Sequence, residues 1–103
     1  MEKFDLTTKE GKEKAKKFAM AQLAIFPPVL YFVFERIFNS DSIEKQAEAV
    51  EKIIEAGKKN GTDELEIKMK NTKGFKLNVP LEVVKIDTEI GSDEEMTLRV
   101  KYK

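Results

Sequence analysis

The side chains that most often carry catalysis are missing from this sequence, which contains no histidine and no cysteine. Histidine is the commonest general base at neutral pH, and both residue types are the usual ligands of zinc. Acid–base chemistry would have to rely on carboxylates, lysines, hydroxyls or the two tyrosines, Tyr31 and Tyr102. No phosphate-binding glycine loop and no nucleophile motif occurs. We therefore expect no enzyme, no catalytic residue and no cofactor.

An acidic cluster in the last fifth of the chain is the best candidate for a metal site. Its members are Asp87, Glu89, Asp93, Glu94 and Glu95. Carboxylate oxygens suit calcium or magnesium, but the cluster lacks the alternating aspartates, the glycine and the distal glutamate of a calcium-binding loop. Charges gathered at a turn are usually solvated. The spacing therefore predicts a solvated turn and no metal site.

Glu35 and Arg36 form a second charged motif, at the end of a strongly apolar stretch. They could be a charged pair that faces a pocket, or the point where a helix surface turns towards solvent. Adjacent residues on a helix do not face each other. We therefore favour the solvent-facing interpretation, with the aliphatic part of Arg36 lying along apolar surface.

The charge balance argues against nucleic acid as a partner. Acidic and basic residues number 19 each, so the chain has no net charge to attract phosphate backbones. Only Arg36 and Arg99 supply a guanidinium group, which can form bidentate hydrogen bonds to phosphates and base edges. We expect no binding to nucleic acid.

The first helix is predicted from a polar start that becomes apolar. Thr7 can cap it, and Glu10 three residues later completes a capping box. Pro28 lacks an N–H group and restricts Pro27 to extended conformations, so this helix should end near Ile25 or Phe26. The alternative is one kinked helix that continues through the two prolines.

Two further helices are expected before the chain changes character. One covers Val29 to about Phe38 and starts at or just after Pro28, where a missing N–H costs nothing. The next begins at Asp41, with Glu44 completing the cap, or at Ser40. Its apolar residues fall on one stripe, and it ends at Gly57 or at the pair Asn60–Gly61.

From Thr62 the apolar residues recur at every second position, which is typical of strands with one buried face. Residues 71–74 predict a turn, and Pro80 and Val83–Val84 predict a bend and a bulge. Residues 1–6 are interpreted as a lead-in. The alternating positions are Leu65, Ile67, Met69, Phe75, Leu77, Val79, Val84, Ile86, Met96, Leu98, Val100 and Tyr102.

These patterns predict an α+β fold in a single domain of residues 1–103. The helical part covers about residues 8–60 and the sheet part about residues 62–103. Two or three N-terminal helices should pack on one face of a three- or four-stranded antiparallel β-meander. Charges on the outer face, such as Glu66 and Lys68, should pair with neighbours such as Lys76 across strands.

The apolar run from Phe18 to Phe34 is the most unusual feature, because Gln22 is its only strongly polar residue. Three interpretations compete: buried core, an exposed patch for a partner or apolar ligand, and membrane insertion. The run is short for a membrane span and Pro27–Pro28 interrupts it, so we do not expect insertion. The residues predicted to line an interface or an apolar site are Phe26, Tyr31, Phe32, Phe34 and Phe38.

We therefore expect a small structural or protein-interaction module that can self-associate as a homo-oligomer or bind another protein. The alternative is a carrier of an apolar small molecule or lipid, held in a cup between the helices and a curved sheet. With no cysteine and no cleavable signal sequence, the expected location is cytoplasmic. Lysine- and glutamate-rich surfaces and turn glycines also fit a designed scaffold, whereas the Phe-Pro-Pro-Val segment does not.

Overall fold

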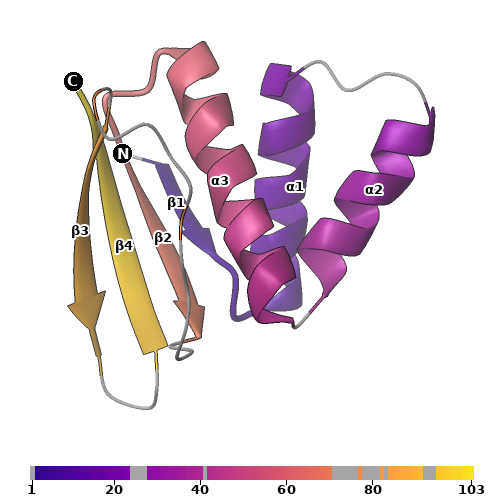
Figure 1. Cartoon of the computed structure of the whole chain (residues 1–103), viewed down its shortest axis with the longest axis horizontal. Coiled ribbons are helices and arrows are strands. Elements are labelled where there is room, and N and C mark those ends of the chain that lie inside the picture. Colours follow the sequence, from indigo (N-terminus) through magenta and orange to yellow (C-terminus); the bar gives the residue numbers. More distant parts are fainter. Residues whose placement is uncertain are drawn as a thin grey trace.

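The computed structural model describes residues 2–23, 28–40, 42–70, 77, 82, 84–91 and 95–103. It is an α+β fold with three helices and a four-stranded sheet (Figure 1). Along the chain, all three helices follow the first strand and precede the second. In chain order the elements are β1 (Glu2–Asp5), α1 (Lys9–Leu23), α2 (Pro28–Asn39), α3 (Ile43–Asn60), β2 (Glu64–Lys70), β3 (Val84–Ile90) and β4 (Glu95–Tyr102).

The sheet is mixed, with strand order β1-β2-β4-β3. β1 runs parallel to β2, with Glu2 opposite Leu65, whereas β2 with β4 and β4 with β3 are antiparallel. The predicted antiparallel meander is therefore wrong, and so is the interpretation of residues 1–6 as a lead-in. β1 and β4 are the two neighbours of β2 in the sheet. The next strand along the chain, β3, therefore does not form a hairpin with β2 and pairs with β4 instead.

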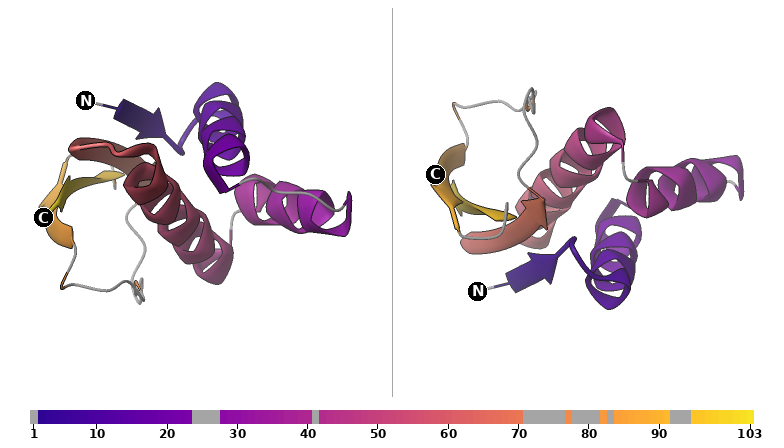
Figure 2. Two further views of the ribbon diagram at one scale, coloured as in Figure 1. Left: turned by 90° about the horizontal axis from the view of Figure 1, so that it is seen from above. Right: turned by 90° about the horizontal axis from the view of Figure 1, so that it is seen from below.

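The helices form two layers on one side of the sheet. α1 and α3 pack against each other next to the sheet, and α2 packs on α1 and α3 on the side farthest from it (Figures 1 and 2). Both views of Figure 2 place α2 at the end of the molecule opposite the sheet. α2 is thus an outer helix with one covered side.

Two separate helices form, as the sequence predicts: α1 ends at Leu23 and α2 begins at Pro28, and the two run in opposite directions (Figure 1). Pro28 is the first residue of α2, where an N–H group would have no helical partner. The predicted end of the first helix at Ile25 or Phe26 lies outside the described residues.

The caps of α1 and α3 differ by one or two residues from the predicted ones. Thr8, not Thr7, caps α1, because its Oγ1 accepts a hydrogen bond from the Gly11 N–H at 3.0 Å. Thr7 instead donates its N–H to the Asp5 carboxylate at 2.9 Å.

At the start of α3, Ser42 caps the helix by accepting from the Lys45 N–H at 3.2 Å, in place of the predicted Asp41 or Ser40. The helix ends at Asn60 and is capped by Gly61, whose φ of 74° is the left-handed conformation that glycine adopts without strain. Of the two predicted ends, the Asn60–Gly61 pair is therefore confirmed.

One hydrophobic core lies between the sheet and α1 and α3, and extends to the inner side of α2. Leu65, Ile67 and Val100 are completely buried, as the alternation in β2 and β4 predicts. Leu77 packs partly buried against this core. The rest of the predicted strand 75–79, Pro80 and Val83 lie outside the described residues. In the described part of the chain, no helix is long and apolar enough to cross a membrane.

Candidate interaction surface

Large apolar side chains project from the outer side of α2. Tyr31, Phe32 and Val33 have exposed fractions of 42%, 66% and 45%. Ile90 of β3 is the other large apolar side chain of the described residues with comparable exposure. Since three exposed apolar side chains are consecutive on one short helix, this is the described surface that departs most from an ordinary polar one.

The predicted interface residues divide between the two sides of α2. Phe32 is exposed on the outer side and Tyr31 on the flank next to Lys16 of α1, but Phe34 and Phe38 are buried in the core with exposed fractions of 4% and 2%. The rings of Phe34 and Phe38 are 6.1 Å apart between centroids. Phe26 lies outside the described residues. A partner docking on the folded domain would therefore contact Tyr31 and Phe32.

Two residues on this outer side were not among the predicted ones. These are Val33, directly after Phe32, and Arg36, four residues after Phe32. Both are exposed. The four-residue spacing places Phe32 and Arg36 one above the other on the same stripe of the helix. The preferred interpretation of Arg36 as a solvent-facing residue agrees with this exposure.

A polar cluster holds one flank of α2 against α1. Lys16 of α1 is buried, and its ammonium group pairs with the Glu35 carboxylate and, at 3.0 Å, with the Glu13 carboxylate. Asn39 donates to the other Glu35 oxygen at 3.1 Å. The Lys16 nitrogen also lies 5.9 Å from the centre of the Tyr31 ring, a cation–π distance. The cluster therefore fixes both the position of α2 and the orientation of Tyr31.

The electrostatics of this cluster keep each group in its ordinary charge state. Burial by itself lowers the pKa of Lys16, but the hydrogen bonds to Glu35 and Glu13 outweigh it and raise that pKa. Hydrogen bonds from Lys16 and Tyr31 lower the pKa of Glu35. The Glu35 carboxylate raises the pKa of Tyr31. None of these three groups is thereby tuned towards proton transfer near pH 7.

The lowered pKa of Glu35 makes the contribution of this residue to stability depend on pH. That contribution is present above the unfolded-state pKa of about 4.3 and is lost as the pH falls through the folded-state value. We expect Glu35→Gln to be less stable than the wild type at pH 7, and the difference to shrink between about pH 5 and pH 3. Urea unfolding at several pH values measures it.

The control for this experiment is the Lys16→Met background. Lys16 causes the largest lowering of the Glu35 pKa. Without this lysine, the effect of Glu35→Gln on the free energy of unfolding should vary less with pH. A wild-type minus Glu35→Gln difference that stays constant from pH 7 to pH 3 would contradict the assignment.

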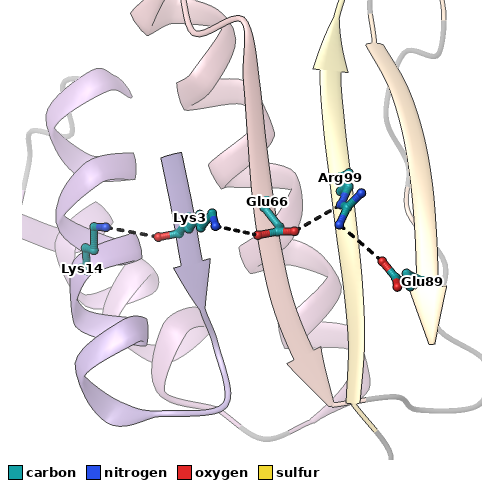
Figure 3. Close-up of polar contacts among 5 residues, drawn as sticks. All are labelled: Lys3, Lys14, Glu66, Glu89 and Arg99. Carbon is teal, nitrogen blue, oxygen red and sulfur yellow. Dashed lines mark hydrogen bonds and ion pairs between the residues drawn. The ribbon is translucent and has the colours of Figure 1, made fainter. Parts of the chain in front are cut away.

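The outer face of the sheet is charged, and its charges pair with one another across all four strands (Figure 3). Glu66 of β2 lies between Lys3 of β1, at 3.8 Å, and Arg99 of β4, at 3.2 Å. Arg99 also contacts Glu89 of β3 at 3.5 Å. From α1, the Lys14 ammonium donates to the Lys3 carbonyl oxygen at 3.2 Å.

A second cross-strand ion pair joins Lys68 of β2 to Glu95 of β4 at 2.9 Å. The predicted pairing of Glu66 and Lys68 across strands is confirmed. The suggested partner Lys76 lies outside the described residues. Exposed pairs of this kind are each worth about 1 kcal/mol or less. These ion pairs engage the charged side chains that a polar partner or ligand would otherwise contact on this face.

A small cavity lies next to Leu6, Ile37 and Phe38. Its volume of about 10 Å³ is at the limit for a single water molecule. Pockets for drug-sized ligands measure about 300–1,000 Å³. No group of three or more acidic residues in the described part of the chain is arranged to hold a metal ion, and Asp93 and Glu94 of the acidic cluster lie outside it.

Comparison of the chain with protein-family models, with characterised proteins and with solved structures finds no match.

Proposed function

We propose that this domain is a protein-interaction module that self-associates through the outer side of α2. We call this area the α2 surface and define it by Tyr31, Phe32, Val33 and Arg36. The observation that carries the proposal is the exposure of three consecutive large apolar side chains, with Phe32 at 66%. Exposed apolar patches on small domains commonly mark interaction sites.

The attachment of α2 supports this proposal. Phe34, Ile37 and Phe38 anchor its inner side in the core, and the Lys16–Glu35 pair holds its flank. A surface held in place from two directions loses little conformational freedom when a partner binds. The aromatic side chains are therefore presented on a rigid base.

The size of the α2 surface sets the strength of the interaction. A helix of 12 residues is about 18 Å long, at about 1.5 Å per residue. One such helix face buries less area than the roughly 1,600 Å² of a standard stable interface. We therefore propose a weak, reversible dimer that dissociates on dilution.

Size-exclusion chromatography with light scattering tests this proposal over protein concentrations from about 1 mM to about 1 µM. We expect the wild type to change from dimer to monomer across this range, and Phe32→Ala to dimerise at least about tenfold more weakly because it removes the most exposed aromatic side chain of the contact. Circular dichroism should confirm that the variant is folded, since Phe32 is outside the core.

Ile90→Ala is the matched control, because Ile90 is equally exposed at 67% but lies on β3. It should dimerise as the wild type does. A wild type that is monomeric at every concentration would overturn the proposal, and so would a dimer that Phe32→Ala leaves intact.

A further inference from the structure

We infer that two copies of α2 pair in antiparallel orientation, so that each Phe32 ring contacts the guanidinium group of Arg36 in the other copy. This inference rests on the proposed self-association and goes further, because it names the residue pair that determines the orientation and specificity of the contact.

The first step is the chemistry of the exposed stripe. Phe32 and Arg36 are both exposed and lie four residues apart on α2, so they are neighbours along one line of the helix surface. The neighbouring Glu35 is occupied by Lys16 and Asn39. Arg36 forms no ion pair with any residue that the structure describes. Its guanidinium group is therefore available to a partner.

The second step is symmetry. In a two-fold dimer, if one residue contacts a second across the interface, the second contacts the first in the same way. When two antiparallel α2 helices cross at the level of position 34, Phe32 of each copy lies opposite Arg36 of the other. Arginine placed over an aromatic ring is a favourable cation–π contact, and it occurs twice in this dimer.

The parallel arrangement is less favourable for the same two residues. It would place Arg36 opposite Arg36 and Phe32 opposite Phe32, so that two uncompensated positive charges would meet at the interface. Like charges brought together across an interface oppose binding. The α2 surface is thus complementary to a second copy of itself only in the antiparallel orientation.

The charge of the whole chain is compatible with a second copy as the partner. With 19 basic and 19 acidic residues, two copies carry no net charge and do not repel each other at long range. Val33, beside the Phe32–Arg36 line, adds apolar area on one flank. No other molecule is needed to complement the aromatic ring and the cation.

The first experiment exchanges the two side chains. Phe32→Arg places arginines at both positions, and we expect dimerisation to weaken by at least about tenfold, because only like charges then meet. The double variant F32R/R36F restores one aromatic ring and one cation in reversed order. We expect it to dimerise within about threefold of the wild type, as measured by sedimentation equilibrium.

The second experiment tests the orientation by mixing dye-labelled wild type with F32R/R36F. In antiparallel pairing a mixed dimer opposes arginine to arginine and phenylalanine to phenylalanine, so the two proteins should sort into homodimers with little energy transfer between dyes. Parallel pairing would make each contact in the mixed dimer complementary and would favour mixed dimers.

Preferential mixed dimers would overturn the inference, as would a Phe32→Arg variant that dimerises like the wild type or a double variant that stays monomeric. In each of these cases a wild-type dimer that is still sensitive to Phe32→Ala would leave the proposed function standing. A wild type that is monomeric throughout would overturn both.

Discussion

Gly11→Ala is expected to lower the free energy of unfolding by about 3 kcal/mol or more, which is the upper range for a side chain forced into filled space. A methyl group on Gly11 would overlap the Asp5 carbonyl oxygen and lie 2.7 Å from the carbonyl carbon. These atoms belong to the backbone at the end of β1 and cannot rotate away. The first turn of α1 or the end of β1 would have to move.

The direction of this effect is opposite to the one that helix propensity predicts. Alanine is favoured over glycine by about 1 kcal/mol in an ordinary helical position. The matched control is Gly91→Ala, because a methyl group there would meet its nearest atom, the Glu95 carbonyl oxygen, at an ordinary 3.8 Å. Urea unfolding of both variants measures the difference, and a Gly11→Ala protein as stable as the wild type would refute the close contact between β1 and α1.

Gly57→Ala is expected to cost about 1–3 kcal/mol, although Gly57 lies inside α3, where alanine is the better helix former. The added methyl group would overlap the Tyr102 hydroxyl and lie 2.7 Å from a methyl carbon of Leu65. Tyr102 is held in this place because its hydroxyl donates to the Ile54 carbonyl oxygen at 2.6 Å. Burial raises the pKa of this hydroxyl, so it stays protonated and able to donate.

A double-mutant cycle separates the two contacts of Gly57. Tyr102→Phe alone removes one hydrogen bond and should cost about 1 kcal/mol. It also removes the oxygen that the new methyl group would meet, so the double variant should be less destabilised than the sum of the single variants. Strict additivity in chemical unfolding would show that the Tyr102 hydroxyl is not what excludes a side chain at position 57.

Local patterns predicted most elements but not how the strands are arranged. Alternation identified β2 and β4, and the two prolines separated α1 from α2, because these signals lie within a few residues of each other. β1 escaped prediction because its four residues contain one buried side chain, Phe4, which is too little to form an alternating pattern. Its pairing with β2 depends on contacts between distant parts of the chain, as does the position of β4 between β2 and β3.

The cap of α1 illustrates how a tertiary contact decides between equivalent local signals. Thr7 and Thr8 have the same capping side chain, and the sequence offers no reason to prefer the second. In the structure Asp5 accepts hydrogen bonds from the N–H and hydroxyl of Thr7, which leaves Thr8 to cap the helix. The end of β1 therefore sets the first residue of α1.

The candidate surface was only partly predictable for a similar reason. The apolar residues of α2 occur almost all the way round the helix, so the sequence does not distinguish the inward side from the outward one. That distinction comes from α1 and α3, which cover Phe34 and Phe38 but not Phe32. The spacing of Phe32 and Arg36 is visible in the sequence, but its meaning depends on knowing that both are exposed.

The strand order has a consequence for the synthesis of the protein on the ribosome. β4 is the last of the four strands to be made, yet it lies inside the sheet and is the strand that joins β3 to the rest. At about 5–20 residues per second, the chain needs several seconds between Phe4 of β1 and its partner Ile67, and longer before β4 emerges. Until then Leu65, Ile67 and Met69, which are completely buried in the finished sheet, lack their β4 neighbours.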